Sequence, residues 1–251
     1  MLRAEGLRFA RGGGRELFGG FSFELPDGCF ALVCGANGAG KSTLLDILAG
    51  LESPGAGTVA LDGAGSRDAL AAGTALVPQD PDVYILGEDA LEELGLGFGL
   101  GPGAGSGAGP TGRAGGKAGG LRAGGGAGDR ILRAAERWGL AEVLRVPAES
   151  LSPGEKKRLA IASALAGEPR AVLLDEPFSG LDWPGTLSLM EDLARLKATG
   201  RTCVVATHEP WLLRDLADAW LLLKKEGSLF TRDAADLKRL PEFGVRPYPG
   251  L

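Results

Sequence analysis

The segment that decides the fold runs from Cys29 to Leu48 and reads CFALVCGANGAGKSTLLDIL. It begins with a short apolar run, Cys29 to Cys34, which predicts a strand buried on both faces. Gly35 to Ser42 then fit the phosphate-loop pattern G-x-x-x-x-G-K-[ST]. Glycines let backbone N–H groups curl around an anion, and the N-terminus of a following helix adds its positive dipole end. We therefore predict a strand, a phosphate-binding loop and a helix that ends at Gly50.

Two side chains of this loop carry the predicted chemistry. Lys41 can reach the outer phosphates of a nucleotide, and the hydroxyl of Ser42 can hold Mg²⁺. The alternative is a chance match in a glycine-rich chain. A buried strand before the pattern and an amphipathic helix after it argue against chance.

The composition of the chain limits its partners. A length of 251 residues allows one large domain or two small ones, and a net charge of −5 gives no global basic field for nucleic acid. The three cysteines lie in apolar runs without C-x-x-C spacing, which favours buried structural thiols. No apolar run is long enough to span a bilayer, and the charged N-terminus lacks a signal-peptide core. Any membrane role is therefore expected to come through a partner.

Short apolar or alternating segments predict further strands. They lie at residues 2–9, 21–25, 57–61, 75–77, 171–174, 203–206 and 219–223. Helices are expected at residues 88–94, from an N-cap at Asp129 to Gly139, in a short piece up to Val146, and at residues 152–165, 185–197 and 234–240. A turn is expected at Glu226-Gly227. This alternation of strands and helices is an α/β pattern.

Residues 95–128 have a different composition, since half of them are glycines. Such a segment cannot recover its ordering entropy by burying apolar surface. The composition favours a flexible inserted linker over a recognition loop.

The stretch Leu151 to Arg158, LSPGEKKR, predicts a well-capped helix start. Ser152 can be the N-cap, Pro153 suits the first helical position, and Glu155 completes a capping box. Read locally, this is only a stable helix terminus. The same terminus is also a candidate anion site.

Two more polar groups follow buried strands. Asp175 and Glu176 end the apolar run that starts at Ala171, and buried carboxylates are costly unless they bind metal, donors or water. In a phosphate-loop protein their natural partners are Mg²⁺ and the attacking water. His208, the only histidine, ends another core strand. A lone histidine is usually structural, but sites in α/β folds collect at the carboxyl ends of strands, which favours contact with phosphate.

These motifs together resemble the ATP-binding subunit of ABC transporters over nearly the whole chain. GANGAGKST resembles the Walker A motif, Gln79 in ALVPQDPD the Q-loop, and LSPGEKKR the ABC signature. AVLLDEP with SGLD resembles Walker B and the D-loop, and THE contains the switch histidine. The resemblance implies a phosphate-loop NTPase of the ABC ATPase type. Its α/β fold has a mostly parallel core sheet, an antiparallel β subdomain and an inserted helical subdomain. Residues 1–251 are then one domain, with the helical subdomain at about 80–166 and the glycine-rich insert at 95–128.

The resemblance also implies a role for each motif residue, with ATP and Mg²⁺ as ligands. Ser42, Gln79 and Asp175 would arrange Mg²⁺, Glu176 would polarise the hydrolytic water, and His208 would contact the γ-phosphate. Ser152, Gly154 and Glu155 of the signature would act on the ATP of a second subunit, and Asp182 would lie at that shared interface. The phosphates would be held by Asn37, Gly38, Ala39, Gly40, Lys41, Ser42 and Thr43.

The sequence departs from the family pattern in two places. The signature usually reads LSGGQ, whereas here Pro153 removes one backbone donor and Glu155 replaces the glutamine. The aromatic residue that usually stacks on adenine would fall near Arg11, which is not aromatic. Stacking by the Arg11 guanidinium is favoured over Phe9 or over weak base binding.

Within the family, QDPDVYILGEDALEEL is similar to the Q-loop region of energy-coupling-factor importers for cobalt, nickel or vitamins. This similarity implies a second ATPase subunit, identical or different, and an integral membrane coupling protein. It places the chain peripherally on the cytoplasmic face of the membrane, without nucleic acid. Three alternatives are the ATPase of another ABC transporter class, a soluble non-transport ABC protein acting on nucleic acid or ribosomes, and a phosphate-loop kinase. The solute cannot be read from this chain.

Overall fold

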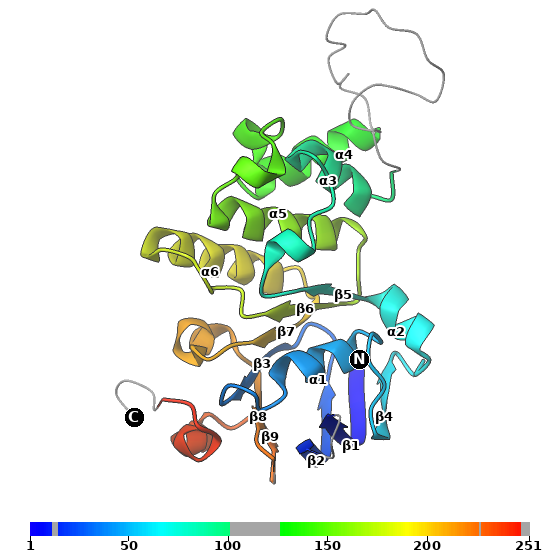
Figure 1. Ribbon diagram of the computed structural model, residues 1–251, viewed down its shortest axis with the longest axis vertical. Helices are drawn as coiled ribbons and strands as arrows, with labels where there is room; N and C mark the ends of the chain where they lie inside the picture. The colour runs from blue at the N-terminus through cyan, green and yellow to red at the C-terminus, as the bar shows by residue number, and fades with distance from the viewer. Residues whose placement is uncertain (12–14, 101–125, 226, 247–251) are drawn as a thin grey trace, which may run out of the picture. The chain divides into compact units, whose positions relative to one another are not determined.

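The computed structural model describes residues 1–11, 15–100, 126–225 and 227–246 (Figure 1). The chain forms two compact units. The first unit contains Met1–Gln79, Pro169–Ser179 and Thr186–Leu251, and the second contains Asp80–Glu168 and Gly180–Gly185. The turn expected at Glu226 and most of the glycine-rich insert lie outside the described residues.

A six-stranded sheet of order β5-β6-β7-β3-β8-β9 forms the centre of the first unit. Every neighbouring pair is parallel except β8 with β9, which is antiparallel. The strands are β3 (Phe30–Gly35), β5 (Thr74–Val77), β6 (Ala171–Asp175), β7 (Thr202–Ala206), β8 (Ala219–Leu223) and β9 (Leu229–Thr231). Strands β3, β7 and β8 are completely buried, as expected for parallel strands covered on both faces.

A second sheet of the first unit is antiparallel, with the order β2-β1-β4. Its strands are β1 (Leu2–Arg11), β2 (Arg15–Leu25) and β4 (Ala56–Leu61). Strand β2 is longer than the strand predicted at residues 21–25, and β9 was not predicted from the sequence. The remaining fold prediction, a mostly parallel sheet with a separate antiparallel one, is confirmed.

The main core of the first unit joins one face of the parallel sheet to helix α1 (Lys41–Leu48) and to the antiparallel sheet. Ala31 and Val33 of β3 belong to this core together with Leu44 and Leu48 of α1. Because strand side chains alternate between faces, every second residue of β3 packs here. The core therefore fixes β3 and α1, the two elements that carry the phosphate-loop pattern.

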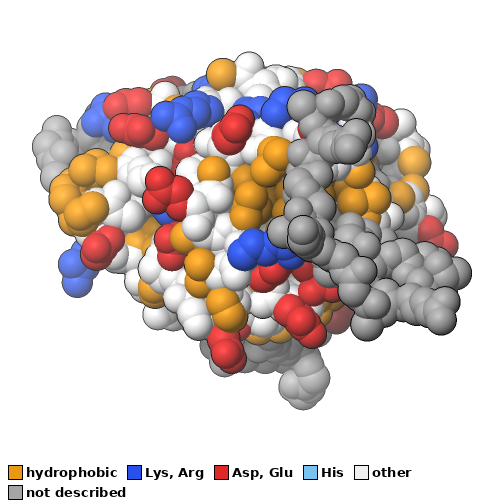
Figure 2. Space-filling view, turned by 90° about the horizontal axis from the view of Figure 1, so that it is seen from above, with side chains coloured by type: hydrophobic (Ala, Val, Ile, Leu, Met, Phe, Trp, Pro, Cys, Tyr) orange, Lys and Arg blue, Asp and Glu red, His pale blue; other side chains and the backbone are white. Residues whose placement is uncertain are grey.

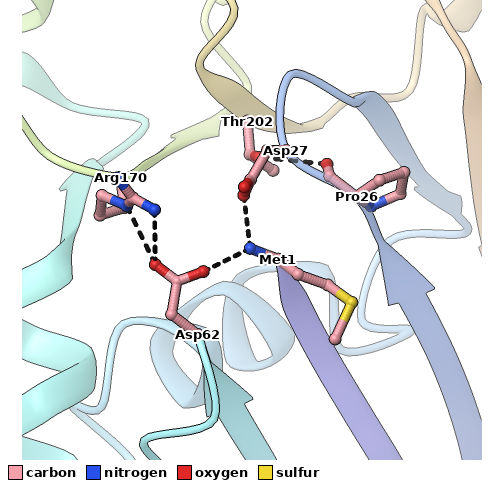
Figure 3. A network of polar contacts seen from close by, with 6 residues as sticks. All are labelled: Met1, Pro26, Asp27, Asp62, Arg170 and Thr202. Atoms are coloured by element: carbon pink, nitrogen blue, oxygen red, sulfur yellow. Dashed lines mark hydrogen bonds and ion pairs between the residues drawn. The ribbon is translucent and has the colours of Figure 1, made fainter.

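A network of polar contacts ties the two sheets together (Figure 3). Asp62, just after β4, accepts hydrogen bonds from the N-terminal ammonium of Met1 at 2.6 Å and from Arg170 Nε at 2.9 Å. Asp27 also contacts the Met1 ammonium. The hydrogen bond from the ammonium group is the main reason why the pKa of Asp62 is lowered. The network joins the end of β4 to Arg170, which precedes β6.

The three cysteines are buried and free, as predicted. Burial raises the pKa of Cys34 and of Cys203 to about 12, and that of Cys29 to about 11. The thiols therefore act as small apolar side chains of the sheet.

The other helices of the first unit connect these strands. They are α2 (Arg67–Gly73), α6 (Trp183–Lys197) and two 3₁₀ segments, η4 (Pro210–Leu216) and η5 (Ala234–Phe243). Helix α6 begins at Trp183, in the second unit, two residues earlier than predicted. The expected helix at residues 234–240 is a longer 3₁₀ segment that contains Pro241, a residue that cannot donate a helical hydrogen bond.

The second unit is helical. Its elements are η1 (Pro81–Val83), α3 (Ala90–Gly97), α4 (Ala127–Arg137), η2 (Ala141–Val143), η3 (Ala148–Ser150) and α5 (Pro153–Ala166). Asp89 caps α3, so this helix starts two residues after the predicted one and extends into the segment predicted as insert. The prediction of Asp129 as an N-cap is wrong, because α4 starts earlier, after Gly126. The expected short helix up to Val146 is the single 3₁₀ turn η2.

Candidate functional site

The register of the parallel sheet brings three of the predicted motifs to one edge. Strand β7 lies between β6 and β3, and Asp175 at the end of β6 is paired with Ala206 at the end of β7. Glu176 follows Asp175, His208 follows β7, and Gly35 ends β3. Since parallel strands share a carboxyl edge, residues far apart in sequence meet there.

The phosphate-loop pattern forms a tight turn into α1. Ala39 N donates to Ala36 O at 3.0 Å, and Gly38 and Gly40 have φ values of 79° and 99°. These left-handed conformations require glycine. No side chain caps α1, so the N–H groups of its first turn face outward as donors for an anion, at the positive end of the helix dipole.

Lys41 and Glu176 form a buried ion pair at this edge. Lys41 Nζ lies 3.4 Å from Glu176 Oε1 and donates to Gly35 O at 3.1 Å. The two side chains are only 8% and 11% exposed. The other carboxylate oxygen, Glu176 Oε2, accepts from His208 N at 3.2 Å and lies 2.8 Å from His208 Nδ1. The Glu176 carboxylate therefore contacts both the Lys41 cation and the His208 imidazole.

The backbone of Glu176 is strained. Its φ is 43°, in the left-handed region that non-glycine residues rarely adopt. Its N–H donates to Ala206 O at 2.9 Å, so that β7 holds the residue in this conformation. Strain of this kind is concentrated at functional sites, where the surrounding structure fixes it.

A cavity of about 440 Å³ lies in front of these groups. It is lined by Leu17, Asn37, Gly38, Gly40, Lys41, Ser42, Thr43, Gln79, Asp175, Glu176 and His208. All but Leu17 are among the residues to which the sequence assigned a role. Ala39 lies within the loop but does not line the cavity.

The donors around the cavity suit a small hard cation. The hydroxyl of Ser42, the amide of Gln79 and the carboxylate of Asp175 are oxygen ligands of the kind that Mg²⁺ prefers. Gln79 Nε2 donates to Ser179 Oγ at 3.2 Å, which orients its amide. Among the described residues, no group of three or more His, Cys, Asp or Glu could hold a metal. This donor set fits Mg²⁺ that is held by one or two protein groups and by nucleotide phosphates.

The signature residues lie at the start of α5 in the second unit. Ser152 is an exposed N-cap, Pro153 occupies the first turn, and the predicted capping box is present. Ser152 N donates to Glu155 Oε2 at 2.8 Å, and Glu155 N donates to Ser152 Oγ at 3.3 Å. The Ser152 hydroxyl also donates to Glu155 Oε2 at 2.7 Å. Glu155 therefore serves its own helix in this structure.

This capping box should make stability depend on pH. Hydrogen bonds from Ser152 lower the pKa of Glu155, so the stabilisation is present above the pKa of the unfolded state and is lost as pH falls through the lower pKa of the folded state. At pH 7 we expect Glu155→Ala to reduce the free energy of unfolding by about 0.5 to 1 kcal/mol, the net contribution of a hydrogen bond at a partly exposed site. Urea unfolding at pH 7 and at pH 3 should show this difference shrinking at the lower pH. Glu136→Ala, which removes an exposed glutamate of α4, is the control and should show no such pH dependence.

Asp182 lies at the beginning of α6, in the second unit. Its Oδ1 accepts a hydrogen bond from Gly185 N at 2.9 Å, as a helix-capping aspartate does. Gly154 lies in the first turn of α5. Neither residue lines the cavity of the first unit.

Phe9 and Arg11 are the two residues considered for stacking on the base. Phe9 packs against the core, with its ring centroid 6.3 Å from that of Phe18. The side chain of Arg11 lies outside the part of the chain that the structure describes. Leu17, which lines the cavity beside Gly40, was not among the predicted site residues. The signal that could have found it is its place in the apolar alternation of β2, shortly after Arg11.

A phosphate loop at the end of a central strand, with Asp-Glu and a histidine at the neighbouring strand ends, defines a phosphate-loop nucleoside triphosphatase. Residues 18–179 match the family model described as ABC transporter. The cobalt import ATP-binding protein CbiO of Rhodobacter capsulatus is 34% identical, in an alignment that covers 98% of this chain and 85% of that relative. The energy-coupling factor transporter ATP-binding protein EcfA of Methanosphaera stadtmanae is 32% identical, with 83% and 70% covered. The chain therefore belongs to the ABC transporter family, as one of its ATP-binding, ATP-hydrolysing members.

Solved structures agree with this assignment. The structure of cbiO1 from Clostridium perfringens, described as part of the ABC transporter complex cbiONQ, has a TM-score of 0.74 and 26% identity. That comparison covers 92% of this chain and 88% of the other. A dimeric ATP-binding cassette in a post-hydrolysis state, bound to ADP and Pi, has a TM-score of 0.71 and 25% identity over 92% of this chain and 98% of that one. Within the described residues, no helix has the length and apolar character needed to span a membrane.

Proposed function

We propose that this chain is the ATPase subunit that powers an energy-coupling-factor importer for cobalt, nickel or a vitamin. The observation that carries the proposal is the similarity to the cobalt import protein CbiO over 98% of the chain. The similarity to EcfA and to cbiO1 of a CbiONQ complex supports the same class.

In the proposed mechanism, the Lys41 ammonium leaves the Glu176 carboxylate and binds the γ-phosphate of ATP. The Lys41 ammonium is shared between Glu176 and Gly35 O, and the γ-phosphate of ATP is a stronger anionic partner. When Lys41 turns to the phosphate, Glu176 keeps its contact with His208 and can accept a proton from water. His208 then contacts the γ-phosphate as it departs.

The backbone of the phosphate loop, from Asn37 to Thr43, would cradle the phosphates. Ser42, Gln79 and Asp175 would hold Mg²⁺, and the ion would neutralise charge that develops on the phosphate oxygens. Arg11 or Leu17 would cover the base. Leu17 is supported by its position on the cavity wall.

The proposed working unit contains two such ATPase chains, identical or different. Ser152, Gly154 and Glu155 of one chain would act on the ATP of the other, and Asp182 would lie at the shared interface. An exposed Ser152 at an α-helix N-terminus supports this arrangement. The Ser152 hydroxyl donates a hydrogen bond to the Glu155 carboxylate at 2.7 Å. This hydrogen bond must break before the hydroxyl can donate to phosphate.

We further propose that residues 1–251 act as one ATPase domain whose helical subdomain, at about 80–166, contacts an integral membrane coupling protein. Val83 and Leu86 in the second unit are 72% and 81% exposed, and such apolar side chains favour a protein partner. Binding to this partner would hold the chain peripherally on the cytoplasmic face of the membrane. The insert at 95–128 has no assigned role.

Nucleic acid is not a proposed partner. The net charge is −5, and the face in Figure 2 shows basic and acidic side chains interspersed with hydrophobic ones. A nucleic-acid-binding surface would concentrate Lys and Arg.

The proposal can be tested by reconstituting the chain with its membrane partners in liposomes. We expect ATP-dependent accumulation of Co²⁺, Ni²⁺ or one vitamin, each tested separately, and no accumulation with Glu176→Gln. Val83→Ser combined with Leu86→Ser should abolish accumulation while the isolated chain still binds MgATP. Purification of the chain with ribosomes or DNA instead of membrane partners would contradict the importer assignment.

A further inference from the structure

Neighbouring segments approach the backbone of the phosphate-binding loop closely on two sides. A Cβ atom on Gly35 would lie 2.7 Å from Leu223 O of β8. A Cβ on Gly40 would lie 3.2 Å from Leu17 Cβ and from the Phe18 ring of β2. The loop therefore depends on neighbours for its shape, and its first turn has a third neighbour.

This third neighbour is the end of the 3₁₀ segment η5. Ala36 N donates to Phe243 O at 2.9 Å. Ala36 O accepts from Ala39 N at 3.0 Å inside the loop. The peptide group before Ala36 is thus held by η5, and the peptide group after Ala36 is held by the loop itself. The position at which the turn begins is therefore set by η5.

Gly244 makes this contact possible. It has a φ of 70°, and a Cβ atom added to it would lie 2.8 Å from Ala36 Cβ and 3.6 Å from Ala36 Cα. Real Cβ atoms do not approach this closely, so any larger residue at 244 must push against the first turn of the loop.

The segment that carries Gly244 is firmly anchored in the first unit. Leu237, Leu240 and Phe243 are buried, and Lys224 Nζ lies 4.7 Å from the centroid of the Phe243 ring. At its other end, Asp233 caps η5 through a hydrogen bond from Ala235 N of 2.8 Å. Because these contacts hold η5 in place, a side chain added at Gly244 would displace Ala36 and not η5.

A cavity of about 400 Å³ shows that the same segment extends toward the catalytic edge. Val245 and Arg246 line it together with Asn37 and His208. Asn37 and His208 also line the candidate nucleotide cavity. The residues that follow Gly244 are therefore neighbours of the phosphate loop and of the histidine after β7.

We propose that Gly244, with the carbonyl of Phe243, is a positioning element for the phosphate-binding loop. It acts through Ala36 and makes no contact with nucleotide itself. The inference rests on the proposed role of residues 37–43 in binding phosphate, and it adds a determinant of affinity outside the family motifs.

The test compares Gly244→Ala with Gly200→Ala by titration calorimetry with MgATP. Gly200 has a φ of 74°, and a Cβ there would meet nothing within 4 Å, so both variants place alanine at a similar left-handed φ. Only Gly244→Ala presses on Ala36. We expect its affinity for MgATP to fall about three- to tenfold, the effect of losing one hydrogen bond, while Gly200→Ala binds as wild type.

A second variant separates the contact from general misfolding. Adding Ala36→Gly to Gly244→Ala removes the Ala36 Cβ, which would lie 2.8 Å from the new Cβ at position 244. The double variant should therefore bind MgATP nearly as tightly as the single variant Ala36→Gly. Amide exchange at Ala36 should be faster in Gly244→Ala and slow again in the double variant.

The outcomes distinguish this inference from the proposed function. If wild type binds MgATP, Lys41→Met binds it more weakly, and Gly244→Ala binds as Gly200→Ala does, the positioning role is wrong and the nucleotide site stands. If wild type itself fails to bind MgATP, the proposed function fails first. Equal losses in both glycine variants would show that only backbone strain is involved and would also overturn the inference.

Discussion

A Glu176→Gln chain is expected to bind MgATP with nearly unchanged affinity but to hydrolyse it at least about 100-fold more slowly. Glutamine keeps the size of the side chain, and its amide oxygen can still accept from His208 N, as Oε2 does at 3.2 Å. It cannot take a proton from the attacking water. Release of inorganic phosphate measures hydrolysis, and calorimetry measures binding.

Glu168→Gln is the matched control for this experiment. Glu168 has a φ of 54°, so it shares the unusual left-handed backbone of Glu176, but it is exposed. We expect its hydrolysis rate to equal that of wild type. Turnover by Glu176→Gln at the wild-type rate would show that this carboxylate does not activate water.

The second large effect is expected for Lys41→Met, which should weaken MgATP binding about 10- to 100-fold. The substitution removes a cation that contacts phosphate through a charge-assisted hydrogen bond. It also leaves Glu176, 11% exposed, without its ion-pair partner at 3.4 Å. Breaking a buried pair is destabilising, so the midpoint of thermal unfolding should fall as well.

Lys197→Met controls for the loss of a paired lysine. Lys197 Nζ contacts Asp218 Oδ1 at 2.7 Å and Leu216 O at 2.7 Å, in the same unit. We expect it to bind MgATP as wild type does. Adding Glu176→Gln to Lys41→Met should recover part of the lost stability, because no carboxylate then remains without a cation. Undiminished MgATP binding by Lys41→Met would contradict the proposed phosphate site.

Local patterns were sufficient for the phosphate loop and for the start of α5. Glycines at 38 and 40 adopt left-handed backbone, and the Ser152–Glu155 capping box forms as expected. The left-handed glycines and the capping box depend on residues a few positions apart, so the sequence predicts them locally. The position of the phosphate loop also depends on distant segments, since Ala36 N donates to Phe243 O of η5. The local pattern gave a wrong prediction at Asp129. A helix N-cap was predicted there, but α4 starts earlier, after Gly126.

The sequence by itself determined the fold class, the family motifs and the cavity residues that follow β3, β6 and β7. Only the tertiary structure decided which of these groups touch: Lys41 with Glu176, Glu176 with His208, and Gly244 with Ala36. It also placed Leu17 on the cavity wall. The physical reason is that turns and caps are stabilised within one short segment. Contacts between distant segments are fixed only when strand register and core packing bring those segments together.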